Sequence, residues 1–276
     1  MARSLDQALI DDILPRYVAR LERKKRTHRT ARSNDDKFAF TRGEVATIML
    51  GTHSDRFHGL WITLLYTGMR FGEAAALTWR DVDPDARTLT ISRSLERVEA
   101  GEPVFSDPKT YASARTLRIP ATLVDFLRAH RMAQGQEKLD AREKQADGEI
   151  VDRYRDHDLI FCSAFGAPLK CRNLYESCQR VVRRLQLPHA SPHTCRHTAA
   201  TNMLQAGVPL NEVSYILGHA GVDVTAKVYA HAIPRGAEIT WTAPRGLRGL
   251  DLLEAWYARG NDARETECGA QDAAGN

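Results

Sequence analysis

The spacing of apolar residues predicts a chain that is mostly helical. Apolar positions recur every fourth residue over 5–21, which fits an amphipathic helix that Pro15 would kink or end. Thr41 and Glu44 have the spacing of a capping box, so a helix is predicted from there to about Leu50. Further helices are predicted over 56–66, 73–77, 120–134, 171–185, 192–206, 209–217, 224–231 and 250–257.

A smaller part of the chain has the alternation of β-strands. Residues 87–92 alternate with branched side chains, and 104–105 and 116–119 predict two further strands joined by a turn at 108–113. A short strand is also predicted at 159–163. Gly207 and Gly218 stand where helix C-caps belong. The fold class expected is α+β, mostly helical, with a small antiparallel sheet.

Composition narrows the class of protein. Hydrophobic residues make up 43% of the 276 positions, which is enough for a substantial core. No apolar run could span a bilayer and the first residues contain no apolar signal core, so a cytoplasmic protein is expected. The five cysteines include no two-residue-spaced pair, and their odd number favours reduced thiols.

The charge is distributed unevenly. The formal net charge is +4, which is compatible with DNA binding but does not establish it. A dense basic run could follow a phosphate backbone, and its composition also fits a solvated linker. The run consists of Arg20, Arg23, Lys24, Lys25, Arg26, Arg29 and Arg32. Small and acidic residues after position 258 predict a disordered tail.

Two arginines are candidates for binding a phosphate. Arg70 lies at a glycine-containing break between helices, and a guanidinium matches phosphate oxygens with a planar fork of donors. Glu73, three residues later, is placed to orient that guanidinium. His193 and Arg196 share one face at a predicted helix start, where free N–H groups favour anions. Taken singly, each also fits an ordinary surface residue.

Three more residues could take part in phosphoryl transfer. Lys109 lies in the predicted turn, from which a lysine could protonate a leaving oxygen. His219 follows a predicted helix end, and Tyr229 lies in a helix. A tyrosine nucleophile must lose a proton whose unperturbed pKa is about 10. Nearby guanidiniums are expected to lower that pKa.

A zinc site is the alternative for the histidine-rich segment. His189, His193, Cys195 and His197 crowd into nine positions. The glutamate of a zinc-helix motif is missing, however, and Arg196 would place a positive charge beside the metal. No metal and no other cofactor is therefore expected.

The order and context of these residues resemble those of the tyrosine recombinases, the family of phage integrases and Xer-type recombinases. The resemblance covers about 38–231. It depends on Thr67 to Glu73, Lys109, His193 to Arg196, Gly218-His219 and Tyr229 to His231, with additional similarity at 204–208 and 213–219.

The resemblance implies site-specific cleavage and rejoining of double-stranded DNA through a 3′-phosphotyrosine. Tyr229 would be the nucleophile, and Arg70, Arg196 and His219 would bind the non-bridging oxygens. Lys109 would protonate the leaving 5′ oxygen, and His193 would assist proton transfer at the phenol. Self-association into a tetramer on DNA, with accessory DNA-bending or directionality factors, is also implied.

The expected domains are a remnant of a core-binding domain with a basic linker (1–36), a catalytic domain (37–258) and the tail (259–276). Family members usually carry a full helical core-binding domain before the catalytic one. We therefore expect weak, salt-dependent DNA binding by this chain. Two alternatives stay open: relaxation of supercoils, as by a type IB topoisomerase, and DNA binding by a truncated integrase without catalysis.

Overall fold

The computed structural model describes residues 39–106, 114–147, 154–187, 192–229 and 248–259. The helices in these ranges are α2 (Arg42–Gly51), α3 (His58–Thr67), α4 (Phe71–Ala75), η1 (Trp79–Asp81, a 3-10 helix), α5 (Ala121–Ala146), α6 (Cys171–Arg184), α7 (Pro192–Gln205), α8 (Leu210–Leu217), α9 (Val222–Tyr229) and α10 (Gly249–Arg259). The strands are β1 (Val82–Asp83), β2 (Thr88–Ile91), β3 (Ser94–Glu99), β4 (Glu102–Ser106) and β5 (Arg115–Arg118). The predicted class, mostly helical with a small antiparallel sheet, is confirmed.

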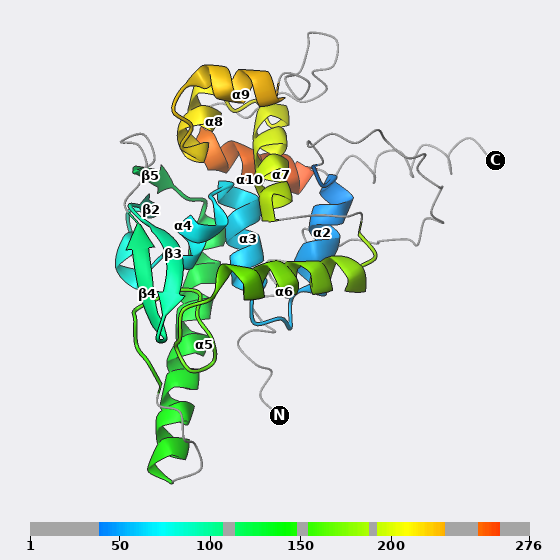
Figure 1. The fold of residues 1–276 in the computed structure, drawn as a ribbon. Coiled ribbons are helices and arrows are strands. Elements are labelled where there is room, and N and C mark those ends of the chain that lie inside the picture. The colour runs from blue at the N-terminus through cyan, green and yellow to red at the C-terminus, as the bar shows by residue number, and fades with distance from the viewer. Residues whose placement is uncertain (1–38, 107–113, 148–153, 188–191, 230–247, 260–276) are drawn as a thin grey trace, which may run out of the picture.

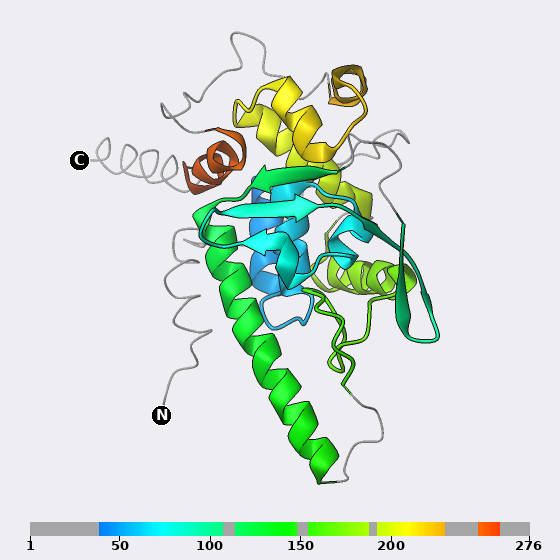
Figure 2. The same cartoon turned by 90° about the vertical axis from the view of Figure 1, so that its left-hand side faces the viewer.

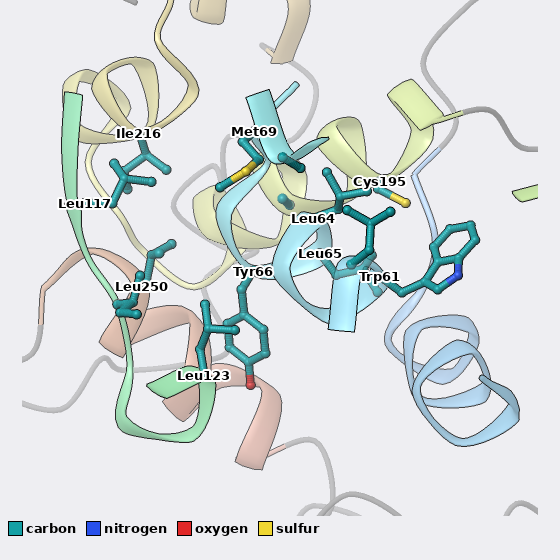
Figure 3. Packing of buried hydrophobic residues seen from close by; sticks show 14 of the residues in the cluster. Trp61, Leu64, Leu65, Tyr66, Met69, Leu117, Leu123, Cys195, Ile216 and Leu250 are labelled. Carbon is teal, nitrogen blue, oxygen red and sulfur yellow. The ribbon is translucent and has the colours of Figure 1, made fainter. Parts of the chain in front are cut away.

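Helix α3 lies at the centre of the fold, with α2, α5, α7 and α10 packed around it (Figure 1). Its sequence is apolar on all sides, as a helix buried on all sides requires. Trp61, Leu64, Leu65 and Tyr66 point in different directions from this one helix into the core (Figure 3). Because Leu65 is fully buried, replacing it with alanine would cost about 2–5 kcal/mol. The helix thus gives the segment that follows it a rigid base.

The strands form two separate antiparallel units, which the sequence did not predict correctly. In one, β5 pairs with β2 and places Leu117 opposite Leu89; in the other, β4 pairs with β3. The predicted strands at 104–105 and 116–119 are therefore not partners of each other. Both Leu89 and Leu117 are buried, so the pairing of β2 with β5 covers a shared apolar face. The predicted strand at 159–163 forms only isolated bridges.

Two helices show which boundaries the local sequence could and could not predict. The capping box of α2 is present: Thr41 N–H donates to Glu44 over 2.8 Å, and Glu44 N–H donates to Thr41 over 3.3 Å. Helix α5 was predicted to end at 134 but continues to Ala146 and projects from the domain (Figure 2). Its second half is mainly polar and exposed, so it lacks the apolar periodicity on which the prediction depended.

Several predicted features lie outside the described residues. These are the helix at 5–21, the basic run at 20–32, the turn at 108–113 with Lys109, His189, His231 and the tail after 259. Within the described ranges, no helix is both long and apolar enough to cross a bilayer.

Candidate active site

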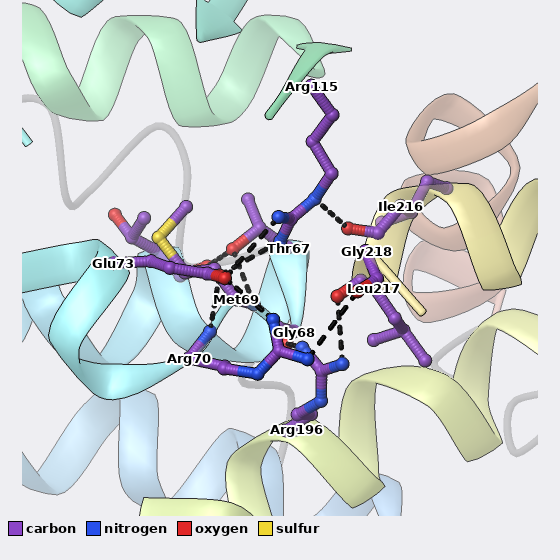
Figure 4. A network of polar contacts seen from close by, with 11 residues as sticks. Thr67, Gly68, Met69, Arg70, Glu73, Arg115, Arg196, Ile216, Leu217 and Gly218 are labelled. Carbon is purple, nitrogen blue, oxygen red and sulfur yellow. Dashed lines mark hydrogen bonds and ion pairs between the residues drawn. The ribbon is translucent and has the colours of Figure 1, made fainter. Parts of the chain in front are cut away.

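Segments far apart in the sequence meet beside the C-terminal end of α8. They are the turn between α3 and α4, strand β5, the first turns of α7, and α9. Figure 4 shows the polar network at their junction, in which Arg70, Arg115 and Arg196 converge from three different elements. Three of the predicted site residues, Arg70, Glu73 and Arg196, belong to this network.

Arg70 is the N-cap of α4, and Glu73 holds it in place. The backbone N–H of Arg70 donates to Glu73 Oε2 over 2.8 Å, and Arg70 Nη1 donates to Glu73 Oε1 over 2.8 Å. The predicted orienting contact is thus confirmed. The Arg70 side chain is 43% exposed, so part of its guanidinium can be reached from solvent.

Arg196 is buried and connects the turn after α3 with the end of α8. Its Nη1 donates to the carbonyl of Gly68 and its Nη2 to that of Leu217, each over 2.8 Å. Burial, with the nearby charge of Arg70 as the next cause, lowers the pKa of Arg196 to about 10. The group therefore stays cationic at neutral pH, and its guanidinium plane is fixed by two backbone acceptors.

His219 follows the αL glycine that ends α8. Its Nδ1 lies 2.7 Å from Oγ1 of Thr225, a buried residue of α9. Burial lowers the pKa of His219 to about 4, and the positive charges of Arg196, Arg70 and Arg115 act in the same direction. The imidazole is thus neutral at pH 7, and the contact with Thr225 sets its orientation.

Tyr229 ends α9 and is only 2% exposed. Its hydroxyl shares a 2.9 Å hydrogen bond with Nδ1 of His197. The Arg196 guanidinium lowers the pKa of Tyr229, as expected, but the net shift is upward. Burial raises the pKa of Tyr229, and the charge of Arg196 offsets only part of that effect.

Two residues of the candidate site were not predicted from the sequence to belong to it. His197 was considered only as a metal ligand, although it is the histidine that contacts the Tyr229 hydroxyl. Its position four residues after His193 was the available signal, since both lie on one helix face. His193 itself is exposed. Arg115 is the second, and its burial could not be predicted without the fold.

The residues of the alternative zinc site do not form a cluster in the part of the chain that the structure describes. No three His, Cys, Asp or Glu side chains there are grouped to hold a metal ion. Cys195 is completely surrounded by protein, which raises the pKa of its thiol well above the usual range. His189, the fourth residue of that alternative site, lies outside the described residues.

Comparison with known proteins agrees with this arrangement. Residues 44–235 match the model of the phage integrase family. A XerC-like tyrosine recombinase of Caldanaerobacter subterraneus is 31% identical over 204 residues, covering 71% of this chain and 51% of that protein. An integrase of Streptomyces ambofaciens is 30% identical over 207 residues, covering 71% of this chain and 49% of that protein. The chain spans about half the length of these curated relatives.

Solved structures show the same fold. The Tn1549 transposon integrase, in complex with transposon right end DNA, superposes with a TM-score of 0.60 at 20% identity, covering 72% of this chain and 63% of that one. The XerA recombinase gives a TM-score of 0.53 at 18% identity, covering 81% of this chain and 65% of that one. Since the family model matches well over half of the sequence, this chain belongs to the phage integrase family.

Proposed function

We propose that the protein is a site-specific DNA recombinase that cleaves and rejoins duplex DNA through a phosphotyrosine intermediate. The observation that carries the proposal is the convergence of Arg70, Arg196 and His219 at one end of α8, with Tyr229 near Arg196. These residues lie up to 159 positions apart, and the fold brings them together. Two fixed guanidiniums and a neutral imidazole are donors suited to a phosphodiester.

In the proposed first step, Tyr229 Oη forms a bond to phosphorus while the bond from phosphorus to the 5′ oxygen breaks. The phenolic proton passes to His197, the residue that already shares a hydrogen bond with it. Lys109, outside the described residues, stays the predicted donor of a proton to the leaving oxygen, and His193 stays a predicted second histidine in this step. The new phosphotyrosine conserves the energy for religation, so no nucleotide is consumed.

The partner we propose is duplex DNA, bound by a tetramer in the cytoplasm, with accessory proteins that set direction. The bound DNA in the Tn1549 complex supports the choice of partner. We also propose that residues 37–258 form the catalytic domain, with a basic linker in residues 1–36 before it and a tail at 259–276. In this proposal, the basic residues from Arg20 to Arg32 add phosphate contacts, which would make affinity fall steeply with salt.

The test is covalent capture on a nicked suicide duplex that carries the attachment site from the flanking DNA. The wild-type protein should give an SDS-resistant adduct, and Tyr229→Phe should give none. DNA affinity should change little, because one hydroxyl contributes little beside the phosphate contacts. Tyr215→Phe is the matched control: that tyrosine is 52% exposed, and its hydroxyl donates to the Thr116 carbonyl. An adduct formed by the Tyr229 variant would refute the assignment.

A further inference from the structure

The last carbonyl groups of α8 are bound by arginines, one each. Arg115 Nε donates to the carbonyl of Ile216 over 2.7 Å. Arg196 Nη2 donates to the carbonyl of Leu217 over 2.8 Å, and Arg70 Nη2 to that of Gly218 over 3.4 Å. The last carbonyls of a helix have no partner within it and carry the negative end of its dipole. Three cations therefore hold the segment that leads directly into His219 (Figure 4).

Arg115 differs from the other two arginines in its burial. Its side chain is 0% exposed, whereas that of Arg70 is 43% exposed. Arg115 is thus too deep to contact a DNA backbone. Its Nη2 lies 3.0 Å from Glu73 Oε2, and the same carboxylate holds Arg70. Arg115 is therefore connected to two predicted site residues, to Arg70 through Glu73 and to His219 through the end of α8.

The backbone at Gly218 is shaped around Arg115. Gly218 has φ +68°, and a Cβ there would lie 2.6 Å from Arg115 Nη1. The guanidinium thus packs against bare main chain, next to the residue that carries the imidazole. A buried ion pair is often no more stabilising than apolar residues of the same volume. Stabilisation of the fold therefore explains poorly why an arginine occupies position 115. Its location beside the candidate active site explains it better.

We propose that Arg115 is a positioning residue of the active site, which fixes His219 and Arg70 without touching DNA. The inference rests on the proposed function, and it adds a residue to the chemistry described above. In this role, Arg115 holds the end of α8 and the Glu73 carboxylate at a fixed separation. A displacement of about 1 Å in such a group can cost on the order of 100-fold in rate.

The first experiment compares Arg115→Lys with Arg56→Lys. Arg56 is a matched control, because it also donates to backbone carbonyls, those of Cys162 and Ser163, and pairs with a glutamate, Glu137. Arg115→Lys keeps the charge but loses the fork that reaches two partners at once. Single-turnover cleavage of the suicide duplex should fall about 10- to 100-fold. The Kd for DNA should stay within about twofold, since no phosphate contact is lost.

Two further readouts separate positioning from a merely structural role. Combining Arg115→Lys with Arg70→Lys should slow cleavage by less than the product of the single effects. Arg115 is proposed to position the Arg70 guanidinium, which the second substitution already removes. In the protein without DNA, an NMR titration should place the pKa of His219 nearer its ordinary value in Arg115→Met. Among the described residues, the charged or titratable groups that act on that imidazole are Arg196, Arg70, Arg115 and His197, of which only Arg115 is changed.

The outcomes are distinct. If Arg115→Lys cleaves as fast as wild type, or if Arg56→Lys slows cleavage equally, the positioning role is refuted. An unchanged His219 titration in a folded Arg115→Met protein would refute it as well; should that variant not fold, the Lys variant decides. If the wild-type chain forms no adduct while the His219 titration moves as expected, the proposed function fails and the proximity of the Arg115 charge to His219 stands.

Discussion

Replacing Glu73 with glutamine would measure what the buried carboxylate contributes. Glu73 is 5% exposed and accepts hydrogen bonds from Arg70 and Arg115. The substitution keeps the shape and removes the carboxylate charge that pairs with the buried Arg115. Removing one partner of a buried pair costs about 3–5 kcal/mol. The Arg70 half is partly exposed and screened, so it adds at most about 1 kcal/mol.

We therefore expect the free energy of unfolding at pH 7 to fall by about 3 kcal/mol in Glu73→Gln, measured by urea titration. The control is Glu137→Gln. Glu137 pairs with Arg56, and both side chains are partly exposed, Arg56 at 30% and Glu137 at 42%. That pair should contribute less than about 1 kcal/mol. A loss below 1 kcal/mol for Glu73→Gln, or equal losses in the two variants, would contradict the reasoning.

The dependence on pH gives an independent check. Burial alone would raise the pKa of Glu73, but the charge of Arg115 and the hydrogen bonds from Arg115 and Arg70 outweigh it, so the net shift is downward from 4.5. A carboxylate whose pKa is lower in the folded than in the unfolded state stabilises the fold at pH values above its unfolded-state pKa. This stabilisation is lost as the pH falls through the folded-state pKa. The difference in the free energy of unfolding between wild type and Glu73→Gln should therefore become smaller below about pH 4. A constant difference down to pH 3 would show that charge is not the cause.

Two further substitutions test the neighbouring geometry. Gly218→Ala would place a side chain in the αL region, at a cost of about 1–2 kcal/mol, and would also displace Arg115. Its melting temperature should drop, whereas Gly43→Ala, in a helix with open space around it, should not lower it. His197→Phe removes the proton acceptor of the Tyr229 hydroxyl, so single-turnover cleavage should slow at least about 100-fold. An unchanged rate would remove His197 from the proposed mechanism.

Local rules predicted those parts of the fold that depend on neighbours in sequence. The capping box at Thr41 and the helix-ending glycine at position 218 were both predictable from a few neighbouring residues. Strand partners were not predictable in this way, because β2 pairs with β5 across 26 positions between Thr90 and Thr116. Strand β3 includes three charged residues among six, which hide its alternation.

The same distinction applies to the site. The predicted contact of Arg70 with Glu73 depends on helical spacing, and it is present. The burial of Arg115 and the pairing of His197 with Tyr229 depend on how α7, α8, α9 and β5 pack, which no local pattern encodes. The pKa of Tyr229 was misjudged for the same reason: proximity of charge was inferred from sequence, but the depth of burial was not.

The electrostatics of the cluster explain why backbone carbonyls matter in the proposed reaction. Arg70 and Arg115 share the carboxylate of Glu73, whereas Arg196 donates to the backbone carbonyls of Gly68 and Leu217. The carbonyl dipoles at the end of α8 stabilise the charges of these arginines in part. A phosphodiester would bring one negative charge, and its pentavalent transition state a second. The arrangement is thus better matched to the transition state than to the bound substrate, which is the condition for catalysis.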